Sequence, residues 1–382
     1  MGAFILERMT IDNYGTWLEI DLGGLTRNFK IISETTGTTL MPVIKANAYG
    51  HGLEKIAKSL EIAGAEWFGV ARIEEALLLR EIGIKSKIIV LGYTAPTRVP
   101  HAIKENITLT VYDRGVAESY ARQAEKLSEM LTLHVKIDTG MGRLGALMEE
   151  AFEFVSDVAR RPEINMEGLF THFACADEPD KPVTKLQIAR FNHLIEKLES
   201  KGIHPSVVHA ANTAGTFIFP ESRFNLARVG IALYGLSPSI HVKIPEGVRP
   251  CLSWKTRLIS IKNLPSGHGI SYGYKYVTKS KERIGVIAAG YGDGLRRQDG
   301  NQALVCGKKA KVIGSVCMDQ CMLQLDDIPE AKIGDEVVLI GQQGIEEITA
   351  TDIAEKWNTI NYEVICGLAS RMPRYYRNNI TV

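Results

Sequence analysis

The chain has 382 residues, a length typical of one large domain joined to a smaller one. Hydrophobic residues make up 45% and charged residues 23%, as in an ordinary soluble globular protein. Lys and Arg together number 45 and Asp and Glu 44, so the formal net charge is +1. With this balance and no basic block, we expect no bulk attraction to nucleic acid or to an anionic membrane.

The N-terminal residues and the cysteines favour a cytoplasmic protein. The apolar stretch before Glu7 is too short for a secretory signal, and no apolar run approaches the ~20 residues of a transmembrane helix. Six cysteines could form disulfides, but the chain is large and shows no export signal, so we expect reduced thiols. Cys317 and Cys321 have no second pair of Cys or His at zinc spacing, and we expect no metal site.

The first 240 residues alternate β-branched runs with amphipathic helical patterns. The expected strands are 39–45, 67–71, 87–92, 108–111, 133–138, 166–173, 206–212 and 226–235. Apolar residues at three-and-four spacing predict helices over 72–83, 114–128, 148–161 and 183–201. Eight strand–helix repeats in about 200 residues favour a (β/α)8 TIM barrel over an open sheet. A ninth candidate strand, TWLEID at 16–21, would shift every later strand by one if it opened the barrel.

After Pro238 the pattern changes to short Val- and Ile-rich segments separated by turns. Strands are expected over 255–263, 283–291, 303–313 and 336–341, followed by helical stretches near 350–358 and 363–370. This pattern is typical of a mainly antiparallel β domain. We therefore predict a barrel over residues 15–240 and a β-rich C-terminal domain over 241–382, with residues 1–14 associated with the latter.

Lys45 is the first candidate for chemistry, because it ends the first expected barrel strand in VIKANAYGHG at 43–52. The carboxyl ends of the strands carry the active site in essentially every barrel enzyme. A lysine at the end of an apolar strand is partly desolvated, which lowers its pKa and suits it to forming a Schiff base. On position alone, a surface lysine at the start of a loop is the alternative.

A phosphate site is expected where the seventh and eighth strands end, because barrels often bind phosphate there through backbone N–H groups. Counted from 39–45, these two ends carry small or polar residues: Asn212, Thr213, Gly215, Gly230 and Ile231. Counting from 16–21 would place them after the eighth and ninth strands, so we leave 16–21 out of the barrel and expect it to pair with the β domain. A strand-end lysine facing a phosphate loop suggests pyridoxal phosphate (PLP).

The segment VIKANAYGHG resembles the cofactor-binding signature of alanine racemases. Further motifs similar to that family follow in order: KIDTGMGRLG at 136–145, THFACADE at 171–178, HAANTAG at 209–215, RVGIALYG at 228–235, ISYGYKY at 270–276, GYGDG at 290–294, VCMDQ at 316–320 and INYEV at 360–364. The resemblance spans residues 16–376, although Thr213 and Gly292 stand where serine and alanine are commoner. It implies a cytoplasmic, PLP-dependent isomerase that interconverts L- and D-alanine and supplies D-alanine for peptidoglycan.

The resemblance also implies roles for individual residues. Lys45 would hold PLP, and Lys45 and Tyr272 would be the two bases that serve opposite faces of the α-carbon. Arg228 is similar to the family arginine that faces the pyridine nitrogen, and His172 to a residue linking Arg228 with the tyrosine. Because arginine keeps its proton, the ring nitrogen would stay unprotonated, which restrains transamination. The resemblance further implies a head-to-tail homodimer in which Tyr272 acts in the partner's site.

Other residues resemble the family's contacts to substrate and cofactor. Arg143 would contact the substrate carboxylate and the phenolic oxygen of PLP, and Lys136 would orient this arginine if it were carbamylated. Met318 would offer its backbone amide to the substrate carboxylate, with Asp319 as a supporting acid. The remaining expected cofactor contacts are Tyr49, Asn212, Thr213, Gly230, Ile231 and Tyr362.

Three alternatives stay open. The nearest is a racemase of broader or serine preference on the same scaffold, although Tyr291 and Tyr362 resemble a gate that favours a small substrate such as alanine. A non-catalytic PLP-binding barrel of cofactor homeostasis would lack the domain at 241–382. A fold-type III decarboxylase would be expected to carry an acidic group where Arg228 stands.

Overall fold

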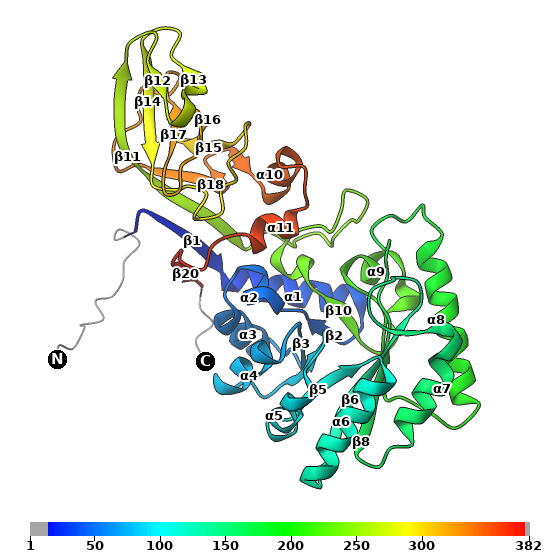
Figure 1. Ribbon diagram of the computed structural model, residues 1–382. Helices are drawn as coiled ribbons and strands as arrows, with labels where there is room; N and C mark the ends of the chain where they lie inside the picture. Colours follow the sequence, from blue (N-terminus) through cyan, green and yellow to red (C-terminus); the bar gives the residue numbers. More distant parts are fainter. Residues whose placement is uncertain (1–13, 379–382) are drawn as a thin grey trace, which may run out of the picture. The chain divides into compact units, whose positions relative to one another are not determined.

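The computed structural model describes residues 14–378, which form two compact units (Figure 1). One unit contains residues 23–48 and 52–250, and the other contains 14–22, 49–51 and 251–378. Our expectations for residues 1–13, an N-terminus without a signal that associates with the C-terminal domain, lie outside the described residues. Across the described part of the chain, no helix is both long and apolar enough to cross a membrane.

The first unit is a closed barrel of parallel strands. Its eight strands are β2 (Leu40–Pro42), β3 (Trp67–Val70), β4 (Lys87–Val90), β5 (Ile107–Val111), β6 (Leu131–Asp138), β8 (Ile164–Phe170), β9 (Val207–His209) and β10 (Ala227–Val229). Strands β3-β4-β5-β6-β8-β9 pair in that order, and β10 pairs with β2. A bridge between Val43 and Gly69 joins β2 to β3, and the bond from Arg228 N to Ala211 O (3.0 Å) joins β10 to the end of β9. The predicted barrel is confirmed.

Helices alternate with the barrel strands along the chain, and α1 precedes the first of these strands (Figure 1). They are α1 (Leu22–Thr36), α3 (Leu53–Ile62), α4 (Ile73–Glu81), α5 (Val99–Lys104), α6 (Arg114–Leu127), α7 (Met148–Ala159), α8 (Val183–Glu199) and α9 (Thr213–Ile218). The four helices predicted from apolar spacing correspond to α4, α6, α7 and α8. Each of these helices buries one face, where Tyr120, Phe154 and Phe191 are among the largest fully buried side chains.

The second unit is built on a nine-stranded sheet with the order β19-β18-β15-β16-β17-β14-β11-β1-β20. Its strands are β1 (Thr16–Asp21), β11 (Leu252–Leu264), β14 (Glu282–Ile287), β15 (Gln302–Val305), β16 (Lys308–Ile313), β17 (Cys321–Gln324), β18 (Glu336–Gln343), β19 (Glu346–Ile348) and β20 (Arg374–Arg377). The short strands β12 (Gly269–Ile270) and β13 (Tyr276–Val277) form a separate hairpin, and the unit also holds helices α10 (Ala350–Lys356) and α11 (Asn361–Cys366). All strand pairs in the large sheet are antiparallel except the parallel pair of β1 with β20. The segment 16–21 therefore pairs within this unit, as β1 beside β11 and β20.

One predicted strand of this unit, 303–313, was wrong because the segment is a hairpin of β15 and β16. Cys306 and Gly307 form its turn, with φ angles of 50° and 76°. Positive φ at both central residues is typical of the tight turn that suits the twist of a two-stranded hairpin. Glycine adopts this backbone freely, whereas cysteine is an unusual residue for the first position.

Candidate active site at the carboxyl end of the barrel

Lys45 follows β2 at the carboxyl end of the strand and opens a short turn, α2 (Lys45–Tyr49). The next three residues, 46–48, have φ between 53° and 55°, the left-handed conformation. This conformation costs L-residues about 1–2 kcal/mol each, so the surrounding structure must hold the turn. Glu75 does so from the start of α4, because its Oε1 accepts a hydrogen bond from Ala46 N at 2.7 Å. The turn therefore fixes the backbone next to the lysine.

Arg228, in the middle of β10, is only 3% exposed and donates five hydrogen bonds. Its NH1 donates to Nδ1 of His209 at 2.7 Å and to the carbonyl of the same residue at 3.0 Å. Its NH2 donates to the carbonyls of Thr171 (2.7 Å) and Ala210 (2.8 Å) and to Nδ1 of His172 (3.1 Å). None of these five bonds uses the Nε–H. Burial lowers the pKa of the guanidinium, yet arginine keeps its proton in proteins, so the group is a fixed cationic donor.

Several cations gather around Lys136, which is 4% exposed on β6. Burial, followed by the charges of Arg228 and Arg143, lowers the pKa of the Lys136 amine to about 8. Lys45 adds to this lowering, and Asp138 opposes it. The same cations, after burial, hold the pKa of His172 well below its usual value, so its imidazole is neutral. A site with this excess of positive charge favours an anionic ligand.

The loop that carries Arg143 is organised by the carboxylate of Asp138. This carboxylate accepts hydrogen bonds from the backbone N–H groups of residues 140–142 at 2.9, 2.7 and 2.9 Å. Gly145 has a φ of 139°, and a Cβ there would lie 2.3 Å from the backbone nitrogen of Asp138. The loop therefore folds back closely on the end of β6 and leaves Arg143 exposed.

The loops after β9 and β10 lie together, as the phosphate hypothesis requires. Asn212 caps α9 by accepting a hydrogen bond from Gly215 N at 2.9 Å. The hydroxyl of Thr213 accepts one from Gly230 N at 3.0 Å, so it joins the two loops. Thr213 is 5% exposed and Ile231 is fully buried. Small residues and backbone N–H groups thus meet at this edge of the barrel.

Two predicted cofactor tyrosines belong to the β-rich unit. The rings of Tyr49 and Tyr362 lie 6.1 Å apart between centroids, at an angle of 47°. Burial, and then the neighbouring Tyr362, raises the pKa of the Tyr49 phenol, which therefore keeps its proton and can act as a donor. A Cβ on Gly50 would lie 2.2 Å from the carbonyl oxygen of Ile365, so only glycine fits beside α11.

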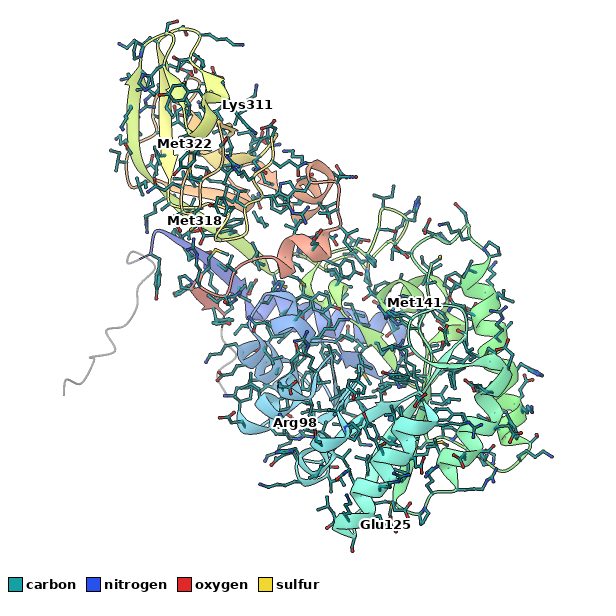
Figure 2. All side chains as sticks on the ribbon, in the orientation of Figure 1. Arg98, Glu125, Met141, Lys311, Met318 and Met322 are labelled. Atoms are coloured by element: carbon teal, nitrogen blue, oxygen red, sulfur yellow. The ribbon has the colours of Figure 1, made fainter. Side chains whose placement is uncertain are left out.

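Tyr272 lies on the surface of the β-rich unit, with 70% of its area exposed. The hydroxyl of Ser315 donates to the carbonyl of Tyr272 (3.1 Å), and the hydroxyl of Ser271 donates to the carbonyl of Ser315 (2.7 Å). These bonds tie Tyr272 to the loop before β17, which carries Met318 (Figure 2). Met318 is 53% exposed.

Two other predicted residues, Tyr291 and Asp319, are associated with this loop: Tyr291 is bonded to it and Asp319 is part of it. Tyr291 N donates to the carbonyl of Cys317 at 3.0 Å, and Arg371 donates to Asp319 at 2.8 Å. A Cβ on Gly292 would lie 2.7 Å from a guanidinium nitrogen of Arg371, so the arginine occupies the space of the side chain that is commoner there.

The predicted residues thus fall into groups within each unit. The barrel unit carries Lys45, Lys136, Arg143, His172, Asn212, Thr213, Arg228, Gly230 and Ile231, and the β-rich unit carries Tyr49, Tyr272, Tyr291, Met318, Asp319 and Tyr362. Our sequence analysis missed three supporting residues. Glu75 accepts from the backbone of Ala46 beside Lys45, His209 accepts from Arg228, and Arg371 donates to Asp319. His209 could have been found, because it opens the HAANTAG motif and ends a predicted strand.

Comparisons with known proteins agree with this arrangement. The model for "Alanine racemase, N-terminal domain" matches residues 20–238, and that for "Alanine racemase, C-terminal domain" matches 251–376. Together, the parallel barrel and the β-rich unit match both domains that define this class of protein. The chain belongs to the alanine racemase family.

Individual relatives match over nearly their whole length. The alanine racemase of Halothermothrix orenii is 44% identical over 369 residues, which cover 96% of this chain and 97% of that protein. The alanine racemase of Symbiobacterium thermophilum is 41% identical over 364 residues, with 94% and 97% covered. Among solved structures, alanine racemase of Clostridium difficile 630 has a TM-score of 0.92 at 38% identity, covering 98% of each chain. The Bacillus anthracis alanine racemase with bound L-Ala-P has a TM-score of 0.90 at 38% identity, covering 96% of each chain.

Proposed function

We propose that this chain is a PLP-dependent alanine racemase that interconverts L- and D-alanine and supplies D-alanine for peptidoglycan in the cytoplasm. Family membership and relatives that carry the name alanine racemase support the activity. The observation that carries the proposal is Arg228, a buried arginine whose two terminal nitrogens are fully engaged while its Nε–H takes part in none of the five bonds. Such a donor suits an acceptor that must not be protonated, such as a pyridine nitrogen.

The donor set of the barrel unit fits PLP. The concentration of cations around Lys136 suits a phosphate-bearing ligand, and the loops after β9 and β10, which the bond from Gly230 N to Thr213 joins, would receive its phosphate. Lys45 would hold the cofactor covalently, and Arg228 would face its ring nitrogen. PLP, when bound, withdraws electrons from the substrate and so acidifies the proton on its α-carbon. The proposed further contacts of the phosphate, which rest on the family resemblance, are Asn212, Ile231, Tyr49 and Tyr362.

The two proton-transferring residues would be Lys45 and Tyr272, one for each face of the α-carbon. Because Nδ1 of His172 accepts from Arg228, the imidazole proton lies on Nε2. His172 can therefore donate a hydrogen bond to the phenolate of Tyr272 and stabilise it. An ordinary tyrosine has a pKa of about 10, so such a donor and nearby cations are needed for it to act as a base.

Tyr272 would reach the site of a second copy in a head-to-tail homodimer. Its exposure supports this, together with that of its neighbours Tyr274 (71%), Tyr291 (45%) and Met318 (53%). Exposed aromatic and methionine side chains are enriched where proteins associate. Met318 and Asp319 would then support the substrate carboxylate, and Tyr291 with Tyr362 would restrict the site to a small substrate.

We also propose that Lys136 is carbamylated and orients Arg143. With its pKa near 8, a fraction of the amine is neutral at neutral pH and can attack CO2. A bond then forms between Nζ and the carbon, one C=O electron pair of CO2 moves onto oxygen, and Nζ loses one proton, so the neutral amine becomes an anionic carbamate beside Arg143. The full chain supplied with ¹³C-labelled bicarbonate should show a carbamate resonance that is missing from Lys136→Met. A free amine at Lys136 under these conditions would remove this part of the proposal.

The central test measures racemisation by the PLP-loaded chain from L-alanine, D-alanine, L-serine and L-lysine. We expect turnover in both directions with alanine and much slower turnover with the other two amino acids. Faster turnover of serine would assign the chain to a serine racemase instead, and no turnover of any amino acid would reject the activity.

Mixing two inactive variants tests the shared site. In a dimer of Lys45→Ala with Tyr272→Phe, one site lacks both bases and the other retains both. Random exchange of subunits should therefore restore about a quarter of the wild-type activity. If each site used residues of one chain, the mixture would stay inactive.

A further inference from the structure

A line of buried polar side chains runs from Arg228 to a carboxylate at the other end of the barrel interior. NH1 of Arg228 contacts Nδ1 of His209 at 2.7 Å, and Nε2 of His209 contacts Nδ1 of His134 at 2.9 Å. Nε2 of His134 in turn contacts Oε2 of Glu167 at 3.2 Å. Both histidines are fully buried. The guanidinium is therefore linked to the carboxylate through two imidazoles in series.

The chemistry of the two ends fixes the direction of every bond in this line. Arginine only donates, so Nδ1 of His209 accepts and its proton lies on Nε2. That proton is donated to Nδ1 of His134, whose own proton must then lie on Nε2 and point at the carboxylate. Burial lowers the pKa of both imidazoles, so each is neutral and holds a single tautomer.

The backbone is shaped to bring Glu167 into this position. Leu133 of β6 pairs with Met166 and His134 pairs with Gly168, so Glu167 is an extra residue of β8 without a partner on β6. A bulge of this kind re-aims a side chain. A Cβ on Gly168 would lie 2.6 Å from the ring of His134, so glycine leaves room for the imidazole.

The outer end of the line meets solvent through an ion pair. Lys87, the first residue of β4, lies 2.6 Å from Glu167 and is 57% exposed, whereas the carboxylate is 14% exposed. Burial opposes ionisation, but the hydrogen bonds from His134 and Lys87 lower the pKa of Glu167 to about 2. The carboxylate is therefore charged and can balance the arginine.

We propose that Glu167 is a positioning residue for the reaction, which acts through His134 and His209 to fix the orientation and the hydrogen-bond direction of Arg228. It would hold the Nε–H of the guanidinium on the ring nitrogen and supply a counter-charge for the buried arginine. The link to catalysis rests on the proposed function, whereas the linkage of the four side chains does not.

The test uses the full chain with ¹⁵N-labelled histidine and arginine, as wild type, Glu167→Gln and Lys87→Met. In the wild type, His134 and His209 should each show a protonated Nε2 and an unprotonated Nδ1. Glu167→Gln should shift the signals of His209 and Arg228, which do not touch position 167. Lys87→Met disturbs the same ion pair but keeps the carboxylate, so it should leave those two signals in place.

The PLP-loaded Glu167→Gln variant should racemise alanine between about 2-fold and about 30-fold more slowly in both directions. Unmoved signals of His209 and Arg228, or wild-type imidazoles with the proton on Nδ1, would overturn the proposal. The wild-type tautomers require no variant, so they decide even if Glu167→Gln fails to fold. If the signals shift as expected but wild-type holoenzyme does not racemise alanine, the linkage stands and the proposed function fails.

Discussion

Replacing Lys136 by methionine tests the charge balance of the barrel interior through stability. Burial and the neighbouring cations lower the pKa of this amine from 10.5 to about 8. Between these two values the unfolded chain binds more protons than the folded chain, so the stability of the wild type rises with pH across this window. Below it, the lysine opposes folding by about 3 kcal/mol, at about 1.4 kcal/mol per pKa unit.

Methionine fills a similar volume and carries no charge, so Lys136→Met should remove this penalty. In CO2-free buffer, where the amine cannot be carbamylated, we expect the variant to be more stable by about 3 kcal/mol at pH 7. The advantage should fall to about 1.5 kcal/mol at pH 9.5, because the wild-type amine is then neutral when folded. Urea unfolding followed by circular dichroism measures both differences.

Lys126, an exposed lysine on α6, provides the matched control. Lys126→Met should change the free energy of unfolding by less than about 0.5 kcal/mol at either pH. The reasoning is refuted if Lys136→Met is no more stable than the wild type at pH 7, or if its advantage does not change with pH.

Three further predictions concern single side chains. Lys45→Ala should abolish both the racemisation of alanine and the visible absorbance of covalently bound PLP. Tyr272→Phe should retain bound PLP but slow proton removal from L-alanine more than from D-alanine, measured as exchange of the α-hydrogen of each enantiomer with deuterated solvent. Gly168→Ala should lower the free energy of unfolding by about 1–3 kcal/mol in urea, because the new Cβ would meet the ring of His134, which two hydrogen bonds hold in place.

Each of these three predictions has an outcome that would contradict it. Persistent visible absorbance in Lys45→Ala would reject Lys45 as the PLP ligand. Equal, mild effects of Tyr272→Phe on α-hydrogen exchange from L- and D-alanine would reject the two-base scheme. For Gly168→Ala the matched variant is Gly69→Ala, whose Cβ would meet side-chain atoms of Met41, Leu91 and Val43, at 3.0, 3.1 and 3.5 Å. A loss of stability at Gly69 as large as that at Gly168 would contradict the explanation from the His134 ring.

The barrel was predictable because a strand–helix pattern recurs along its sequence. Alternating β-branched runs and amphipathic helices are local patterns, and each strand and helix can be read without knowing its partners. The hairpin at 303–313 was not predictable in this way. Its turn depends on a left-handed backbone at Cys306, which the pairing of β15 with β16 imposes against the local preference of the residue.

The residue types of the site were predictable, but the turn and the hydrogen bonds that hold them in position were less so. Lys45, Arg228 and the loops at Thr213 and Gly230 stand at strand ends, where barrel chemistry takes place. Residues 46–48 include two alanines, which favour right-handed helix, so nothing local indicates the left-handed turn beside Lys45. The carboxylate that holds this turn comes from Glu75, 29 positions from Ala46, and only the folded structure brings it there.

The segment 49–51 has a consequence for the order in which the protein is completed during synthesis. Arg374 donates to the carbonyl of Gly50, 324 positions away, and Tyr376 donates to that of His51, 325 positions away. Ribosomes add about 5–20 residues per second, so between about a quarter of a minute and about a minute separates the two halves of each bond. Gly50 and His51, which follow Lys45 by five and six positions, thus obtain these two bonds only when the last strand, β20, has left the ribosome. A chain that stops short of Arg374 contains every barrel strand and still lacks them.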